Sequence, residues 1–214
     1  LLMAALAALY FFRAAPDAGE ETQSASGTVE EAFSFDAHSS NRYAAFDGGL
    51  AVASASGLSV YAADGTERRI VQTSMTTPTI QTCQDMVLAY DAGGYSLITV
   101  GKKGKELLNL TAAKPILDAD LSPDGFVCDS TSESGYKSVL YVYNPNGTMI
   151  YRWLSSSQYL PVCTVSTGAK YLAAVAYGQQ EGMFQSSVVL FDTAQDEPLH
   201  ELPLGDELIF DLEF

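Results

Sequence analysis

The sequence predicts an all-β fold, a β-propeller of four-stranded antiparallel blades, from three repeated features. Strand-like runs begin at Pro78, Pro115 and Pro161, and proline at the first position of a strand removes no ladder hydrogen bond. Each run is followed by three further strand-like segments with turns between them. The unit recurs about every 36 to 46 residues, as propeller blades do. A β-sandwich is the alternative, but it would not keep the prolines and the turns in phase.

The turns inside the repeated unit indicate where its strands lie. Residues 101–104 (GKKG) and 144–147 (NPNG) close the hairpin between the third and fourth strands, where glycine supplies the positive φ of such turns. Residues 122–125 (SPDG) lie between a first and a second strand, and residues 178–187 are expected as a Gly- and Ser-rich turn between a second and a third. The predicted blades span residues 41–77, 78–114, 115–160 and 161–206, and a fifth begins at residue 207. The incomplete propeller as a whole is expected to cover residues 33–214. Residues 33–35 are expected to form an outermost strand.

The N-terminal segment is predicted to attach the propeller to a membrane. Residues 1–12 are all apolar and Arg13 ends the run. A bilayer-spanning helix needs about 20 apolar residues, and the chain opens on Leu1 rather than methionine, so we expect residues 1–13 to be a truncated transmembrane anchor. A cleaved signal peptide is the alternative, because its apolar core is about this short. Residues 14–32 hold five acidic residues and no basic one, which predicts a flexible linker and an extracytoplasmic propeller.

The composition argues against a nucleic-acid-binding protein and shows no catalytic motif. The chain has 26 acidic and 11 basic residues, a net charge of −15, so no basic patch could neutralise phosphates. His38 and His200 have no partner at metal-ligand spacing. The sequence contains no Gly-x-Ser-x-Gly elbow and no phosphate-binding glycine loop. The protein is therefore predicted to be neither an enzyme nor a cofactor-binding protein.

The three cysteines, Cys83, Cys128 and Cys163, lie in strands of different repeats. An odd number excludes complete pairing. Because cysteine behaves as a small apolar residue in a core, we expect all three to be buried free thiols.

The SPDG turn at residues 122–125 resembles the turn found in WD40-like and related bacterial propellers. The anchor, the acidic linker and the irregular blades together resemble membrane-anchored propellers of Gram-positive bacteria that are grouped as a domain of unknown function. The resemblance covers nearly the whole chain and implies a fold and a membrane location, but no activity. The chain departs from better-understood propellers, because it lacks the Gly-His and Trp-Asp pairs of a WD40 blade. Its single tryptophan, Trp153, also excludes the repeated Trp motif of quinoprotein dehydrogenases.

A candidate site emerges when the first strands of the repeats are aligned. Asp118 and Asp120 then share positions with Asp211 and Glu213, and the residues between them are nearly all apolar. Because side chains alternate along a strand, the four acids would point from the innermost strands into the central channel. Oxygen ligands of this kind suit Ca²⁺, so a calcium site is one hypothesis. The other is that these acids hydrogen-bond to loop amides or lie in the water of the channel.

Two functions remain compatible with the sequence. The first is a single-pass, membrane-anchored, non-catalytic binding or scaffolding module on the cell surface, whose propeller face holds a protein or a cell-wall glycan. The second is a cell-envelope enzyme, such as a glycan hydrolase, with catalytic residues on inter-strand loops or in further blades. Propellers place functional groups on such loops, where short motifs do not reveal them.

Overall fold

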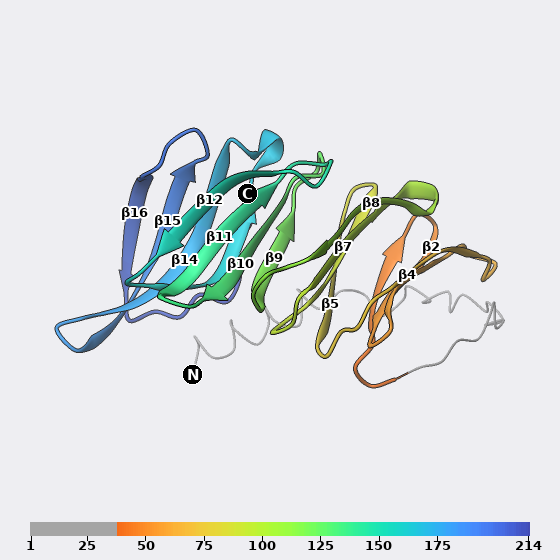
Figure 1. Cartoon of the computed structure of the whole chain (residues 1–214), viewed down its shortest axis with the longest axis horizontal. Helices are drawn as coiled ribbons and strands as arrows, with labels where there is room; N and C mark the ends of the chain where they lie inside the picture. Colours follow the sequence, from red (N-terminus) through yellow and green to blue (C-terminus); the bar gives the residue numbers. More distant parts are fainter. Residues whose placement is uncertain (1–37) are drawn as a thin grey trace, which may run out of the picture. The chain divides into compact units, whose positions relative to one another are not determined.

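The computed structural model describes residues 38–214, which form an all-β structure of four antiparallel sheets (Figure 1). The expected anchor (residues 1–13), the expected linker (14–32) and the expected strand at 33–35 lie outside the described residues. Within residues 38–214 no helix has the length and apolar character needed to cross a bilayer.

Each sheet is one propeller blade in which consecutive strands are hydrogen-bonded neighbours. The first blade contains β1 (Arg42–Phe46), β2 (Gly49–Ser54), β3 (Gly57–Tyr61) and β4 (Glu67–Gln72). The second contains β5 (Pro78–Cys83), β6 (Met86–Asp91), β7 (Ser96–Gly101) and β8 (Lys105–Thr111). The third contains β9 (Ile116–Leu121), β10 (Val127–Glu133), β11 (Tyr136–Tyr143) and β12 (Met149–Ser155). The fourth contains β13 (Tyr159–Val165), β14 (Tyr171–Gln180), β15 (Met183–Asp192) and β16 (Pro198–Gly205).

Short turns join these strands, and two of them require glycine. Gly104 has a φ of +74° and Gly147 a φ of +78°, the left-handed region that disfavours other residues. Space is also restricted at both turns. A Cβ atom at Gly104 would lie 2.7 Å from the carbonyl oxygen of Arg68 in the first blade, and one at Gly147 would lie 2.9 Å from Cδ1 of Leu108 in the second. These glycines therefore shape the hairpins and let neighbouring blades approach each other.

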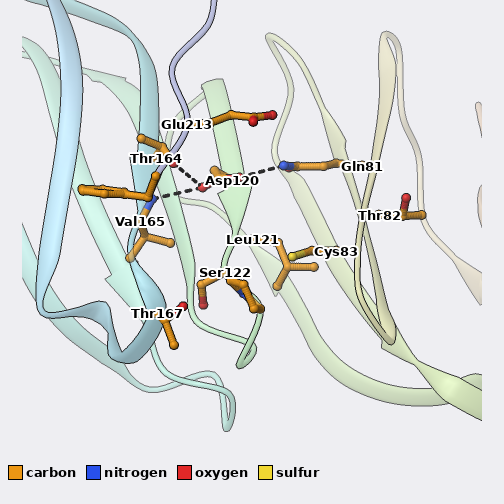
Figure 2. A pocket seen from close by; sticks show the side chains of 12 residues that line it. Gln81, Thr82, Cys83, Asp120, Leu121, Ser122, Thr164, Val165, Thr167 and Glu213 are labelled. Carbon is orange, nitrogen blue, oxygen red and sulfur yellow. Dashed lines mark hydrogen bonds between the residues drawn. The ribbon is translucent and has the colours of Figure 1, made fainter.

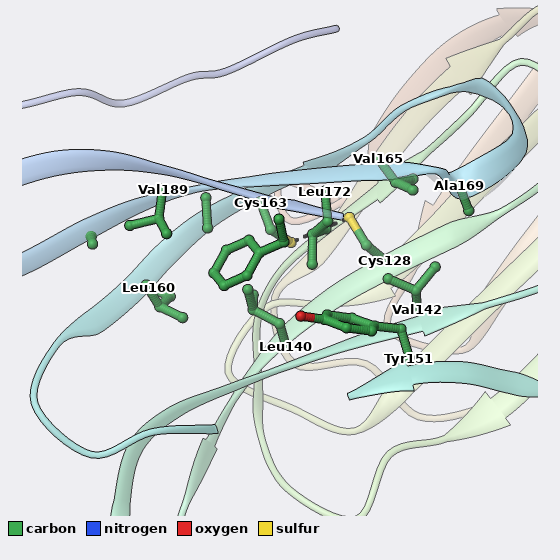
Figure 3. Packing of buried hydrophobic residues seen from close by; sticks show 13 residues of the cluster. Cys128, Leu140, Val142, Tyr151, Leu160, Cys163, Val165, Ala169, Leu172 and Val189 are labelled. Carbon is green, nitrogen blue, oxygen red and sulfur yellow. Dashed lines mark hydrogen bonds between the residues drawn. The ribbon is translucent and has the colours of Figure 1, made fainter. Parts of the chain in front are cut away.

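The hydrophobic core lies between successive blades. One cluster joins the first and second blades, with Val60 and Ile98 among its members. A second joins the second and third blades and includes Leu88 and Val127. The third joins the third and fourth blades (Figure 3). Because a middle strand is covered on both faces, the residues of β7 are apolar or small, and all six are buried.

Two details differ from the sequence-based expectation. Pro161 is the third residue of β13 and not its first. The ladder between β13 and β14 shifts register between Tyr159 and Val162, and such an irregularity tolerates a residue without a backbone N–H.

Residues 207–214, expected to begin a fifth blade, form neither strand nor helix. A strand needs a ladder partner, and no described strand pairs with this segment. Instead, the Tyr177 hydroxyl donates a hydrogen bond to the carbonyl oxygen of Ile209 and accepts one from its N–H at 3.0 Å.

Candidate functional site

The four acidic residues singled out from the sequence line one pocket of about 290 Å³, called here the central pocket. Its walls are formed by the first strands of three blades, β5, β9 and β13, and by the C-terminal segment 207–214. A neighbouring pocket of about 220 Å³ shares Asp120 and Glu213 with it (Figure 2). Alignment of the first strands thus leads to residues that share a pocket, but their side chains have different surroundings.

Asp120 links three blades through its carboxylate. One oxygen accepts a hydrogen bond from Nε2 of Gln81 on β5 at 2.7 Å. The other accepts hydrogen bonds from the hydroxyl of Thr164 at 2.8 Å and from the N–H of Val165 at 3.0 Å, both on β13 (Figure 2). Because all three donors belong to other blades, this carboxylate holds the second and fourth blades to the third.

Asp118 makes the same kind of link two residues nearer the start of β9. Its carboxylate accepts hydrogen bonds from the Tyr90 hydroxyl at 2.9 Å and from the N–H of Cys163 at 2.9 Å. Burial raises the pKa of Asp118 above its ordinary value, while these two hydrogen bonds oppose the shift. Burial and the nearby Asp118 charge in turn raise the pKa of Tyr90, which keeps the phenol protonated as a donor.

The SPDG turn adds a third link of this type. Asp124 accepts a hydrogen bond from the Ser122 hydroxyl at 2.7 Å within the turn, and another from the N–H of Gly168 in the fourth blade at 2.8 Å. Asp118, Asp120 and Asp124 are called here the bridging carboxylates. The alternate spacing of Asp118 and Asp120 along β9 was visible in the sequence, but the donors from other blades were not, because they lie about 30 to 45 positions away from the carboxylates.

Asp211 and Glu213 are exposed and make no such links. Among residues 38–214, Asp211 accepts a hydrogen bond only from the N–H of the adjacent Leu212, at 2.9 Å. Across residues 38–214 no group of three or more His, Cys, Asp or Glu side chains is placed to hold a metal ion. His38 bonds to Ser40 and His200 is exposed on β16. The calcium hypothesis therefore stays a prediction that calcium-dependent thermal melts can test.

Asp129 on β10 is a buried carboxylate that sequence reasoning did not single out. It is 0% exposed, and neither carboxylate oxygen has a hydrogen-bond partner in the described part of the chain. Burial raises the pKa of Asp129 to about 7, and the nearby Tyr143 hydroxyl opposes this shift without reaching hydrogen-bond geometry. A polar residue in a buried strand is visible in the sequence, but its lack of a donor is not.

A second pocket, also missed from the sequence, is rich in aromatic side chains. The aromatic pocket has a volume of about 380 Å³ and is lined by Lys137, Tyr159, Tyr177, Gly178, Gln179 and Phe184. The ring centroids of Tyr177 and Phe184 are 5.4 Å apart, and Nζ of Lys137 lies 5.0 Å from the centroid of the Tyr159 ring. Tyr159 is 55% exposed and Phe184 is 38% exposed. These rings are therefore available to a ligand.

The aromatic pocket exists because β14 and β15 are longer than their neighbours. Both strands have ten residues, but β13 pairs with β14 only as far as Tyr177, and β16 pairs with β15 only as far as Ser186. Residues 178–185 therefore extend beyond the blade as a two-stranded hairpin, at the lower left of Figure 1. The sequence predicted a Gly- and Ser-rich turn here. The correct reading is a hairpin, because cross-strand pairs such as Gln179–Phe184 continue the ladder to its tip.

Solved β-propeller structures resemble this fold at low sequence identity. Hydrazine synthase of Kuenenia stuttgartiensis is 14% identical, with a TM-score of 0.52 over 73% of this chain and 51% of its own. Hsv2 of Kluyveromyces lactis is 11% identical, with a TM-score of 0.52 over 76% of this chain and 51% of its own. A KlHsv2 variant with loop 6CD replaced by a Gly-Ser linker is 10% identical, with a TM-score of 0.56 over 81% and 57%. Likeness at these identities shows the fold alone, and the chain spans little more than half of each structure.

Comparison with the curated proteins finds no match to this sequence. The match to a family model, in contrast, covers residues 21–214 and so includes the whole described propeller. Because the matched family model covers most of its length, the chain belongs to the family of unknown function DUF5711.

Proposed function

We propose that this protein is a non-catalytic binding module, anchored in the membrane by its N-terminus, which holds a protein partner on the extracytoplasmic side through the aromatic pocket. The observation that carries the proposal is the pocket itself. Tyrosine and phenylalanine are the side chains that protein interfaces use as buried anchors. Tyr159 and Phe184 leave much of their surface uncovered, although most apolar side chains of this fold are buried.

The polar groups around the aromatic pocket also suit a peptide ligand. The side-chain amide of Gln179 lies in its wall and has no partner among the described residues. Gln158 and Glu201 line an adjoining pocket of about 380 Å³, where Nε2 of Gln158 donates to Glu201 at 2.9 Å. A free amide can donate to and accept from a peptide backbone. A protein side chain in the pocket with its backbone along this wall would use both features.

The charge of the chain favours a basic partner. A net charge of −15 on 214 residues produces a negative field that attracts a positively charged surface and accelerates its association. Of the lysines, Lys137 alone lines the aromatic pocket, and its ammonium group is directed at the Tyr159 ring. We therefore expect a partner that combines an apolar anchor side chain with basic flanks.

The surroundings of Asp118 and Asp120 in the central pocket support a non-catalytic role for these two residues. A general acid and base pair needs carboxylates that can exchange protons with a substrate. Asp118 and Asp120 instead accept hydrogen bonds from neighbouring blades. The alternative is a cell-envelope glycan hydrolase with catalytic groups on the loops. Hydrolysis of cell-wall oligosaccharides by the full chain, abolished by a loop substitution that leaves the fold intact, would establish this alternative.

Binding can be tested with variants of the aromatic pocket. A displayed peptide library and a panel of cell-wall oligosaccharides are screened against the full chain, and the affinity of each bound ligand is measured for Tyr159→Ala and Phe184→Ala. Tyr95→Ala is the matched control, because Tyr95 is 47% exposed but lies in the second blade. We expect basic peptides whose affinity falls about tenfold or more in the pocket variants, since loss of an anchor costs over about 1 kcal/mol, and is unchanged in the control.

Other outcomes of this screen would change the proposal. Oligosaccharides that bind in place of peptides and lose affinity in the same variants would make the pocket a glycan site. Ligands that are indifferent to both pocket variants would place the binding surface elsewhere.

The anchor is tested separately. The full-length protein is expected to fractionate with membranes and to release its propeller when a protease cuts within residues 14–32, because that segment is acidic and has no apolar periodicity. Proteolysis of intact cells tests the extracytoplasmic location. Recovery of a secreted protein that starts near residue 16 would instead support the signal peptide.

A further inference from the structure

Two of the three cysteines meet at the interface between the third and fourth blades. Cys128 lies on β10 and Cys163 on β13, and their sulfur atoms are 3.5 Å apart (Figure 3). Both thiols are free, Cys128 is 0% exposed and Cys163 is 2% exposed. Burial of the thiols agrees with the sequence for these two residues, but not for Cys83, which is only half-buried on β5.

The surroundings of the two sulfur atoms hold them together. The backbone N–H of Cys163 donates to Asp118 at 2.9 Å, and Cys128 lies opposite Asp120 in the ladder between β9 and β10. Leu140, Leu160 and Leu172 belong to the same core cluster. The bridging carboxylates thus fix the two strands at a spacing where the sulfur atoms already touch, and a modest approach would complete a bond.

We propose that Cys128 and Cys163 form a disulfide that links the third blade to the fourth when the chain folds in the presence of a disulfide oxidant. One cysteine thiolate attacks the oxidant's S–S bond, which forms a mixed disulfide and releases one oxidant thiol. The second cysteine thiolate then attacks the protein sulfur of that mixed disulfide and releases the other oxidant thiol. Two electrons pass to the oxidant, and the two protons lost by the cysteines end on its thiols.

The bond forms faster before the two blades dock than after docking. Burial raises the pKa of Cys128, and the contact between the two thiols together with burial raises the pKa of Cys163. Since the thiolate is the reactive form, and an oxidant cannot reach side chains this deeply buried, the folded and reduced protein reacts slowly. In the unfolded chain both thiols are accessible and have ordinary reactivity.

The disulfide would stabilise the contact between the two blades. The linked residues are 35 positions apart, and the intervening chain contains β11 and β12. Closing a loop of this length restricts the unfolded chain and so stabilises the folded one. The inference is independent of the aromatic pocket and of the membrane anchor, because it depends on the core alone.

The test uses the full chain carrying Cys83→Ser, which removes the half-buried third thiol. The protein is unfolded under reducing conditions, refolded in a mixture of reduced and oxidised glutathione, and alkylated. We expect it to be lighter by the two thiol hydrogens, to yield a peptide pair joined through Cys128 and Cys163, and to resist alkylation at both. Adding reductant should lower its Tm by about 5 to 10 °C. The matched variant with Cys83→Ser and Cys128→Ala should show no effect of reductant on its Tm.

Two results would overturn the proposal. One is that both thiols remain free after refolding in a glutathione mixture that fully oxidises a disulfide-bonded reference protein. The other is that wild-type protein forms its disulfide through Cys83. Adding oxidant to the folded, reduced protein tests whether the disulfide forms before or after the blades dock. If the disulfide then formed as fast as one between exposed thiols, formation before docking would be contradicted.

Discussion

The central pocket and the aromatic pocket use polar and aromatic side chains in opposite ways. In the central pocket, Asp118 and Asp120 accept hydrogen bonds from groups on neighbouring blades. In the aromatic pocket, the Tyr159 ring is mostly uncovered and the Gln179 amide has no partner within residues 38–214. Hydrogen-bonding groups therefore serve the fold at one site and remain available at the other. The proposed binding surface therefore rests on the available groups of the aromatic pocket and not on Asp118 and Asp120.

Removing a bridging carboxylate tests this comparison with the largest expected effect. Asp120→Ala leaves three donors from two neighbouring blades without their acceptor, so we expect it to lower the free energy of unfolding by about 3 kcal/mol. Urea denaturation followed by circular dichroism measures the change. Asp211→Ala is the control, because Asp211 is exposed, and it should cost less than about 0.5 kcal/mol. Equal losses in the two variants would contradict the bridging role.

Asp129 extends the comparison to a carboxylate that is buried but not bridged. Its pKa in the folded state is about 7, above the unfolded value of about 3.9. Below about pH 3 the carboxyl is neutral in both states. As the pH rises towards 7, it ionises first in the unfolded state, so stability falls across this window.

The Asp129→Asn variant should not show this loss. A one-unit pKa shift corresponds to about 1.4 kcal/mol, and the buried amide offsets part of the gain, so we expect Asn to stabilise the protein by about 2 kcal/mol at pH 8 and not at pH 4. Urea melts of both proteins between pH 4 and 8 provide the measurement. Parallel curves would show that Asp129 ionises equally easily in both states.

Tyr177 connects the aromatic pocket to the C-terminal segment, part of which lines the central pocket. Its ring lines the aromatic pocket, while its hydroxyl makes two hydrogen bonds to the backbone of Ile209. Tyr177→Phe should cost about 1 kcal/mol and speed hydrogen exchange at Ile209, without changing the rest of the ladder. Unchanged exchange at Ile209 would show that other contacts hold the C-terminal segment.

The smallest effect on stability is expected in the aromatic pocket itself. Phe184 is exposed on the hairpin that extends beyond the blade, so Phe184→Ala should change the free energy of unfolding by less than about 0.5 kcal/mol. A larger loss in thermal or urea melts would mean that this ring supports the fold rather than a ligand.

The fold could be predicted from the sequence because its signals are local. The glycines at the hairpin turns, such as Gly104 and Gly147, and the alternation within each strand recur in phase. Pro161 and residues 207–214 were placed less well. A register shift and the lack of a ladder partner depend on neighbouring strands, which the local pattern does not contain.

The sites were less predictable because they depend on contacts between distant residues. Alternation along β9 directs Asp118 and Asp120 to one face, but whether they meet a cation or an amide depends on Gln81 and Thr164, which belong to other blades. Gly178 made the segment after Tyr177 resemble a turn, and this concealed the hairpin with Phe184. The contact between Cys128 and Cys163 likewise depends on how two blades dock.

The two hydrogen bonds between Tyr177 and Ile209 also connect two equilibria. A ligand that reorients the Tyr177 ring has to break both bonds, and so it releases the C-terminal segment from β14. By thermodynamic reciprocity, anything that draws residues 207–214 away changes the affinity of the aromatic pocket for that ligand by the same factor. Through the Tyr177 hydroxyl, ligand binding in the aromatic pocket would thus change how firmly residues 207–214 are held.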